Sequence, residues 1–322
     1  MRRKRHYRHC MVGHMRKILV LVANVLFNHN FVFRIIGVMN RRWNFLSSVF
    51  VAYPATKDYT SAYIYQRHWH LMKWTPWICG IFRQESKWGL CLGITSTEED
   101  FCHPENTGNL QTLAERAERI RQLIGASQKT FAGILPGILF KKRLIRETVE
   151  SEITVESIVK AEKYVRNSEG YDENTPLIIL GGNGFVGRRL IKRLNGREVY
   201  CVDSINGKTN VASWPFHLKE SSAIMINISR SHALAYYTNL FWPGLVLLNE
   251  VYPEPGKDEL KIITEKGCSA YHVVGIQGKA YPSFAYAYAG GIPCCAASIS
   301  EDMQVIVKKL NYLQGQEMPR YQ

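Results

Sequence analysis

The pattern of apolar and polar positions is most regular in the second half of the chain. From residue 177 onwards, short runs of consecutive apolar residues recur at 177–180, 198–202, 223–228, 245–249 and 271–275. Continuous apolar runs of this length are typical of strands buried on both faces of a parallel sheet. The intervening patterns predict helices over 185–194, 257–266 and 300–313. This alternation predicts an α/β fold in which helices cover a parallel sheet.

The preceding residues give a mixed pattern. Apolar strands are expected at 87–95 and 130–135, and a helical repeat over 109–125 ends at Gly125. Ser96 followed three residues later by Glu99 matches a capping box and predicts a helix start. Another helix is expected from Thr154 to the residues before Gly170. These elements predict a mixed α/β domain.

Residues 171–176 are polar and close with a proline, which is typical of a domain boundary. We therefore divide the chain into a basic, partly apolar segment over 1–45, an α/β substrate domain over 46–170, and a second domain over 171–322 that ends in a closing helix.

The charge is concentrated at one end. The formal net charge is +14, yet residues 1–57 contain 11 Lys and Arg and no acid, so the remainder is close to neutral. This distribution argues against a nucleic-acid protein with a basic face along its length. The apolar stretches 18–27 and 31–39 are too short and too interrupted to span a bilayer. They fit an interfacial anchor on an anionic membrane, a buried helix of the first domain, or, with a poor cleavage site, a signal peptide.

The eight cysteines include no Cys-x-x-Cys pair and match no zinc motif. Reduced thiols, and therefore a cytoplasmic protein, are the simpler interpretation. The basic segment favours attachment to the inner face of the membrane. His68, His70 and Cys79 lack a fourth ligand at a suitable spacing, so no metal site is predicted.

A glycine motif links the strand at 177–180 to the next helix. Gly182, Gly184 and Gly187 fit the pattern G-x-G-x-x-G, with Asn183, Phe185 and Val186 between them. We expect Gly182 to make the tight turn, Gly184 to let the backbone approach a pyrophosphate, and Gly187 to bring helix and sheet together. The helix start would then offer N–H groups and a positive dipole end to a dinucleotide.

Asp203 lies 21 residues after Gly182, where a carboxylate accepts hydrogen bonds from the adenosine ribose. It favours NAD, while Lys208, Arg188 and Arg189 keep NADP open as an alternative. The strand ends at 223–228 and 245–249 add Asn227, Ser229 and Asn249 as further cofactor-binding candidates.

Two resemblances extend this interpretation. The segment from Val246 to Pro253, followed by a helix and residues 267–275, resembles the end of the Rossmann domain in shikimate dehydrogenase-like oxidoreductases. That resemblance implies an NAD(P)-dependent enzyme for a small polar substrate, with Asn227 and Ser229 on the nicotinamide side. A short-chain dehydrogenase is not expected, because no Tyr-x-x-x-Lys pair follows the glycine motif.

The second resemblance is to long-chain acyl-carrier-protein reductases. The order of domains is similar, and Cys294, Ala296 and Ser298 match a C-x-A-x-S context before the last expected helix. The resemblance implies that Cys294 attacks an acyl thioester and that hydride from the nicotinamide releases an aldehyde. Asp203 departs from the NADPH preference of that family. Alternatively, Cys294 and Cys295 are small buried apolar residues.

His272 and Lys279 flank the last expected strand and are candidate general acids. Together these patterns predict an NAD(P)-dependent oxidoreductase of an acyl thioester, with a C-terminal Rossmann sheet and an N-terminal mixed α/β domain. The alternatives are a reductase of a small polar substrate and a non-catalytic nucleotide sensor at the membrane surface.

Overall fold

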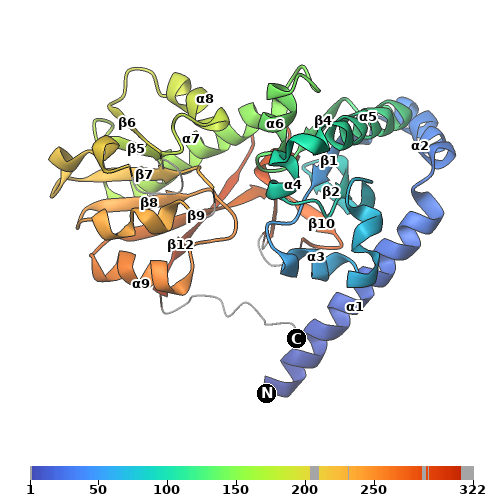
Figure 1. Cartoon of the computed structure of the whole chain (residues 1–322), viewed down its shortest axis with the longest axis horizontal. Helices are drawn as coiled ribbons and strands as arrows, with labels where there is room; N and C mark the ends of the chain where they lie inside the picture. Colours follow the sequence, from blue (N-terminus) through green and yellow to red (C-terminus); the bar gives the residue numbers. More distant parts are fainter. Residues whose placement is uncertain (1, 204–209, 231, 285–287, 289, 313–322) are drawn as a thin grey trace. The chain divides into compact units, whose positions relative to one another are not determined.

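The computed structural model describes residues 2–203, 210–230, 232–284, 288 and 290–312, with side chains from residue 13 onwards. The chain forms two compact units. Unit 1 comprises Met1–Glu150 and Gln277–Ile299, and unit 2 comprises Ser151–Ile276 and Ser300–Gln322. Each unit is built around its own sheet (Figure 1). The expected α/β class is confirmed, with both parallel and antiparallel strand pairs.

Unit 1 has a five-stranded sheet in the order β10-β2-β3-β1-β4. Its strands are β1 (Leu46–Ala52), β2 (Trp77–Gln84), β3 (Lys87–Gly93), β4 (Gln128–Phe131) and β10 (Lys279–Tyr281). β1 runs parallel to β3 and β4, whereas β2 is antiparallel to β3 and β10. The short strand β11 (Gly291–Ile292) and the 3₁₀ turn η7 (Cys294–Ala296) follow in the returning segment.

The helices of unit 1 pack around this sheet. They are α1 (Arg2–Phe27), α2 (Asn30–Trp43), α3 (Lys57–Tyr63), α4 (Glu98–Cys102), α5 (Thr107–Ile124) and α6 (Leu135–Lys141), with 3₁₀ segments η1 (Gln66–Met72) and η2 (Pro104–Asn106). The apolar repeat of α5 is fully buried, as its spacing predicted. Gly37 of α2 lies so close to α5 that a Cβ there would be 1.9 Å from the carbonyl oxygen of Leu123. The two helices can therefore pack only if this position is glycine.

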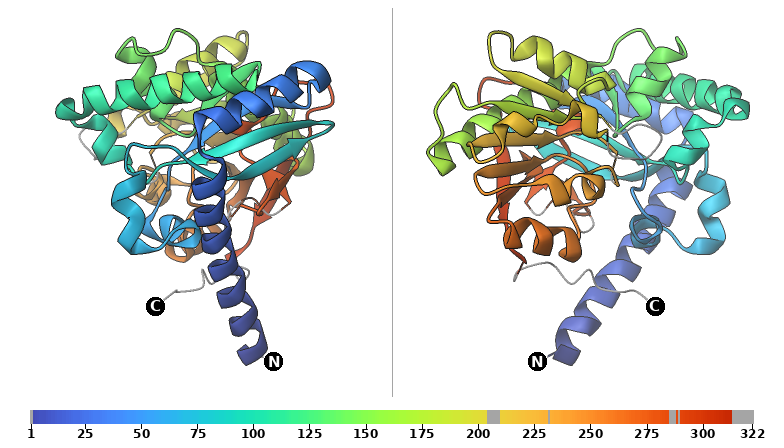
Figure 2. Two further views of the ribbon diagram at one scale, coloured as in Figure 1. Left: turned by 90° about the vertical axis from the view of Figure 1, so that its right-hand side faces the viewer. Right: turned by 60° about the vertical axis from the view of Figure 1, so that its left-hand side comes forward.

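The predicted segment 1–45 is part of unit 1 and consists mainly of α1 and α2. Figure 2 shows a sharp bend between these two helices, which are drawn in blue. Among the described residues, no single helix has the length and apolar character needed to cross a membrane. Gly13–Phe27 and Asn30–Trp43 meet these criteria only as a pair, and that pair is bent by 86°.

Unit 2 contains five parallel strands in the order β6-β5-β7-β8-β9, with β12 antiparallel to β9. The strands are β5 (Leu177–Leu180), β6 (Val199–Val202), β7 (Ala223–Asn227), β8 (Leu245–Asn249), β9 (Ser269–Gln277) and β12 (Val305–Leu310). All five predicted parallel strands are confirmed. β5, β7 and β8 are continuous runs buried on both faces, and β9 is buried over most of its length, whereas β6 at the edge is only partly buried.

Helices α7 (Val149–Glu169) and α8 (Phe185–Arg193) lie on one side of this sheet, and α9 (Lys257–Glu265) lies on the other (Figure 1). The α9 side is completed by four 3₁₀ turns, η3 (Val211–Ser213), η4 (Phe216–Leu218), η5 (Leu234–Tyr236) and η6 (Thr238–Leu240). Trp214, Tyr237 and Trp242 pack there into the core. Aromatic side chains thus cover a face where the described residues of the β6–β7 and β7–β8 connections form no α-helix.

The predicted boundary at 171–176 is wrong, because this segment is a loop inside unit 2. Arg166 of α7 is buried, pairs with Glu162 and donates hydrogen bonds to the carbonyl oxygens of Asp172 and Thr175. Those bonds fix α7 to the start of β5. The boundary between the two units instead lies between residues 150 and 151, and the chain returns to unit 1 for residues 277–299.

Three local predictions also fail. The closing helix expected at 300–313 is the strand β12, since Val305, Ile306 and Val307 are β-branched and pair with β9. The strand expected at 130–135 ends at Phe131, and the Pro136–Gly137 pair lies inside α6. The capping box of α4 uses Thr97 and Asp100, one residue beyond the expected positions.

Candidate functional site

The carboxyl ends of the unit 2 strands gather the polar residues of the candidate site. β5 is flanked by β6 and β7, so the chain leaves β5 first toward one side of the sheet and then returns to the other. In open α/β sheets, ligands bind outside the carboxyl ends of the strands at such a reversal of strand order. The loops after β5 and β7 touch here, because a Cβ on Gly181 would lie 3.0 Å from the backbone of Ser229.

The loop after β5 depends on its glycines, although not in the way that the motif predicted. The tight turn is made by Gly181, whose φ is +96°, and not by Gly182. Gly182 packs against Cys201 of β6, and a Cβ there would lie 2.9 Å from the Cβ of Cys201. The expectation for Gly187 holds, because a Cβ on it would be 2.2 Å from the carbonyl oxygen of Gly181.

Gly184 is the N-cap residue of α8 and provides no side-chain cap. A Cβ at this position would lie 2.9 Å from the carbonyl oxygen of Gly181. Asn183 and Gly184 are exposed, Phe185 and Val186 are half-buried, and no acidic side chain lies in the first turn. The positive dipole end of α8 therefore lies at an exposed stretch of backbone whose N-cap residue has no side chain.

Asp203 lies at the end of β6 and reaches back to the glycine loop. Its Oδ2 accepts hydrogen bonds from the backbone N–H of Asn183 at 3.0 Å and from the Asn183 side-chain amide at 2.8 Å. The structure thus brings the predicted ribose-binding carboxylate to the predicted phosphate loop. Lys208 lies outside the described residues, and Arg188 is exposed on α8.

A row of hydrogen bonds crosses the carboxyl ends of β7, β8 and β9. The Ser229 hydroxyl donates to Asn227 Oδ1 at 2.9 Å, and Asn227 Nδ2 donates to Asn249 Oδ1 at 2.7 Å. Asn249 Nδ2 in turn lies 3.0 Å from His272 Nδ1. Asn227, Asn249 and His272 are essentially inaccessible to solvent. Four residues predicted separately therefore form one connected chain of neutral polar groups.

His272 ends this row with its second nitrogen unpaired. Because Nδ1 accepts from Asn249, Nε2 carries the proton, and it has no hydrogen-bond partner among the described residues. Oε1 of Glu254 lies 4.0 Å away, and the Tyr252 ring packs edge-on against the imidazole. Burial lowers the pKa of His272 to about 3, and the charge of Lys308 adds to this effect. The imidazole is therefore neutral at pH 7 and is a poor general acid.

Glu250 is a titratable residue of this edge that the sequence analysis missed. It directly follows β8, and its backbone N–H donates to the carbonyl oxygen of Asn227 at 3.0 Å. Glu250 is half-buried, and the loss of solvent around it raises the pKa of its carboxyl group to about 8, so that group is largely protonated at neutral pH. Such a value suits proton transfer near physiological pH. Glu250 follows a fully buried strand, and only that position in the sequence hinted at its environment.

Comparison of the chain with models of known protein families gives no match, and a search of the curated proteins finds no related sequence.

The other two predicted catalytic residues belong to unit 1. Lys279 is exposed on the edge strand β10, opposite Arg83 of β2. Cys294 is buried in the three-residue turn η7, and the α-helix expected to follow it does not form. A helix dipole is therefore not available to stabilise a thiolate at Cys294.

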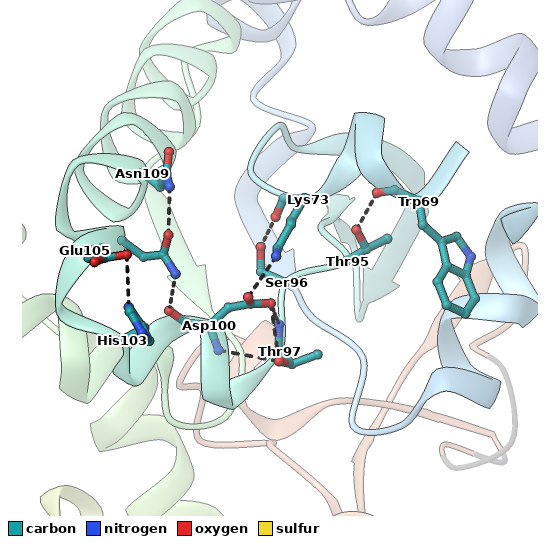
Figure 3. A network of polar contacts seen from close by, with 10 residues as sticks. Trp69, Lys73, Thr95, Ser96, Thr97, Asp100, His103, Glu105 and Asn109 are labelled. Atoms are coloured by element: carbon teal, nitrogen blue, oxygen red, sulfur yellow. Dashed lines mark hydrogen bonds and ion pairs between the residues drawn. The ribbon is translucent and has the colours of Figure 1, made fainter. Parts of the chain in front are cut away.

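Unit 1 has its own polar network near the end of β3 (Figure 3). Lys73 forms an ion pair with Asp100 at 2.9 Å, and the Thr95 hydroxyl donates to the Trp69 carbonyl oxygen at 2.7 Å. Ser96 donates to the carbonyl oxygen of Lys73. These bonds join η1 to the start of α4. Among the described residues, no group of three or more His, Cys, Asp or Glu side chains is placed to bind a metal ion.

Proposed function

We propose that this protein is an NAD(P)-dependent oxidoreductase of carbonyl compounds that binds its dinucleotide at the carboxyl edge of the unit 2 sheet. The observation that carries the proposal is the loop from Gly181 to Gly187. Side chains at Gly184 and Gly187 would meet backbone at 2.9 and 2.2 Å, and the loop leads into a helix with no side-chain cap. Bare backbone followed by an open helix start is the arrangement that receives a pyrophosphate.

The surrounding residues fit the rest of such a ligand. Asp203 is held beside the loop by Asn183 and supplies a carboxylate for the adenosine ribose. Asn227 and Ser229 lie at the end of β7, next to Gly181, on the side suited to the nicotinamide. When bound, the dinucleotide supplies the hydride or accepts it. The row from Ser229 to His272 fixes the orientation of the amide groups around it.

Glu250 is the proposed proton donor. A carbonyl that receives a hydride must also receive a proton at its oxygen, and a neutral carboxylic acid at the strand edge can donate one. Its raised pKa keeps that proton available at neutral pH. His272 then acts as a positioning residue, because it is buried and neutral and holds Asn249.

The acyl-thioester reaction through Cys294 stays a prediction, now without the support of a helix start at the thiol. It requires an acyl adduct on the protein after incubation with an acyl-CoA, detected by intact mass and lost in Cys294→Ser.

Calorimetric titration of the full chain with NAD⁺, NADH, NADP⁺ and NADPH tests the proposal. Gly184→Ala is the diagnostic variant, and Gly256→Ala is its matched control. Both glycines are N-cap residues of nine-residue helices in unit 2, but a Cβ on Gly256 would meet only the flexible Glu259 side chain, at 3.6 Å. We expect Gly184→Ala to weaken dinucleotide binding at least tenfold and Gly256→Ala to leave it unchanged.

The absence of heat with all four nucleotides, or equal affinities in the two variants, would overturn the proposal. Turnover then separates an enzyme from a nucleotide sensor. Oxidation of NADH or NADPH in the presence of a panel of aldehydes, ketones and acyl thioesters is expected for the enzyme, and Glu250→Gln should reduce this rate without weakening nucleotide binding.

A further inference from the structure

Helices α1 and α2 expose an unusually apolar surface. More than half of the large apolar side chains that are exposed in the described part of the chain lie between residues 15 and 43. We define the N-terminal apolar face by its most informative members, Ile18, Val22 and Val25 of α1 and Phe31, Val38 and Trp43 of α2. Val25 is 70% exposed and Trp43 is 65% exposed. This concentration of exposed apolar side chains in one segment is typical of an interaction surface.

The exposed apolar residues recur at helical spacing, so they share one side of each helix. On α1, residues 18, 22 and 25 follow a helical repeat, while Val20 and Asn24 on another face are buried. On α2, the buried residues are Phe33, Gly37 and Asn40, and Phe31 and Val38 are exposed. An ordinary surface helix would place polar residues outward. Each of these helices instead carries large apolar side chains on its exposed side as well.

The charged residues of α1 and α2 are all basic. Residues 1–57 contain 11 basic residues and no acid. On α2, Arg34, Arg41 and Arg42 are all exposed beside the apolar residues. Exposed apolar side chains on helices whose own charged residues are all basic complement an anionic phospholipid surface, where each basic residue adds to the attraction. A protein partner of mixed charge would not require the absence of acids.

Two buried asparagines decide how the helices can meet a bilayer. Asn24 of α1 exchanges two hydrogen bonds of 2.8 Å with the backbone of Ile78 in β2. Asn40 of α2 bonds to the backbone of Leu46 in both directions and donates to the carbonyl oxygen of Ile124 at 3.0 Å. If α1 and α2 left the body of unit 1, these side-chain amides and backbone groups would lose their hydrogen-bond partners. The helices must therefore contact lipid while they stay attached to the sheet.

We propose that unit 1 docks on the anionic surface of a phospholipid bilayer, with α1 and α2 lying in the headgroup region and their N-terminal apolar face directed into the acyl boundary. This inference is independent of the proposed dinucleotide site. It places the molecule on one leaflet and does not require the chain to cross the bilayer.

Cosedimentation of the full chain with vesicles tests the proposal, using phosphatidylcholine with 30% phosphatidylserine against phosphatidylcholine alone. The diagnostic variant is Val25→Asp combined with Val38→Asp, and the control is Val211→Asp, a valine that is 52% exposed in unit 2. We expect the bound fraction on anionic vesicles to fall at least tenfold in the double variant and to stay unchanged in the control. The triple change of Arg34, Arg41 and Arg42 to Gln should weaken the preference for phosphatidylserine, since eight basic residues of the segment remain.

Several outcomes would overturn the proposal. Equal pelleting of the double variant and the control would show that this face does not contact lipid. A dimer in light scattering that the double variant abolishes, in a protein that ignores vesicles, would assign the face to a second copy of the chain. Resistance to extraction at pH 11 would indicate insertion across the bilayer. A cooperative thermal unfolding transition in each variant confirms that the variant is folded. We expect the same nucleotide affinity in all variants, whether or not they bind vesicles.

Discussion

Helices α4 and α8 each follow a sheet strand, and they begin in opposite ways. In unit 1, α4 follows β3, and Thr97 and Asp100 cap it through a reciprocal capping box. Three acidic residues lie in its first turn. In unit 2, α8 follows β5 with a bare glycine at the N-cap and no acidic residue in the first turn. The first helix start is completed by the chain itself, while the second keeps its positive end available to an anion.

The difference shows how local hydrogen bonding distinguishes a helix start that the chain caps with its own side chains from one that is left without a side-chain cap. Both helices have a positive dipole end at the N-terminus, and in both the first N–H groups need hydrogen-bond acceptors from outside the helix. In α4 the requirement is met at once by side chains, which stabilises the fold. In α8 the nearest carboxylate contact is made by Asp203 to Asn183, just before the helix.

The largest effect is expected from Gly187→Val. The added side chain would meet the carbonyl oxygens of Gly181 and Gly182, at 2.2 and 2.5 Å from Cβ, and would push α8 off the sheet. We expect a loss of about 3 kcal/mol or more in the free energy of unfolding, measured in urea, together with loss of dinucleotide binding. Gly108→Val in α5 is the control, since a Cβ there meets nothing within 4 Å. Similar losses in both variants would refute the close packing.

The next effect concerns the pH dependence of stability. The folded protein keeps the Glu250 proton up to a pKa of about 8, whereas the unfolded chain releases it near 4.5, so stability falls as pH rises between these values. The His272 pKa of about 3 acts oppositely, because stability falls as pH drops below 6.5. The two contributions cancel between pH 4.5 and 6.5.

Stability should therefore be nearly flat in that window and should decline by up to about 2 kcal/mol from pH 6.5 to 8. Glu250→Gln should abolish the decline. Urea midpoints measured at half-unit pH steps provide the test. A decline of the same size in the variant would mean that another group titrates.

A smaller effect is expected for cofactor choice. Asp203→Ala removes a carboxylate that repels a 2′-phosphate, so the ratio of NADH to NADPH affinity should shift about tenfold toward NADPH, equivalent to about 1.4 kcal/mol. Asn183→Ala is the control, because it removes the side-chain hydrogen bond of 2.8 Å but keeps the charge of Asp203. It should weaken both nucleotides alike. Calorimetry that gives the same ratio in both variants would remove Asp203 from the ribose site.

The smallest effect belongs to the capped helix. Thr97→Ala removes the side chain that accepts from the Asp100 N–H and should lower the free energy of unfolding by about 1 kcal/mol. Dinucleotide affinity should not change. Any change in affinity beyond twofold would show that the two helix starts do not serve separate purposes.

The sequence was sufficient for features that depend on local pattern. The strands of unit 2 are continuous apolar runs, and the glycine loop lies between a strand and a helix that are each recognisable alone. The same holds for Asp203, Asn227 and Asn249, which directly end or follow strands. Gly181 was overlooked because the spacing rule starts at Gly182, while only backbone angles reveal which glycine turns.

Features that depend on distant partners could not be predicted. β12 has two lysines and a short apolar run, and only pairing with β9 makes it a strand. The polar loop before β5 has the composition of a linker, but Arg166 holds it through hydrogen bonds to the carbonyl oxygens of Asp172 and Thr175. The protonation of Glu250 follows from burial, which no spacing reveals. The apolar pattern of α1 and α2 likewise gave no sign of which face stays exposed.

The placement of β10 bears on how the protein is made. Its three residues, Lys279–Tyr281, complete a sheet whose neighbouring strand β2 ends at Gln84. During synthesis on the ribosome, almost two hundred further residues must therefore be made before β10 can pair with β2. The intervening chain includes most of unit 2. An exposed strand edge over that interval is a site where nascent chains associate wrongly, so a chaperone that shields β2 would raise the yield of correctly folded protein.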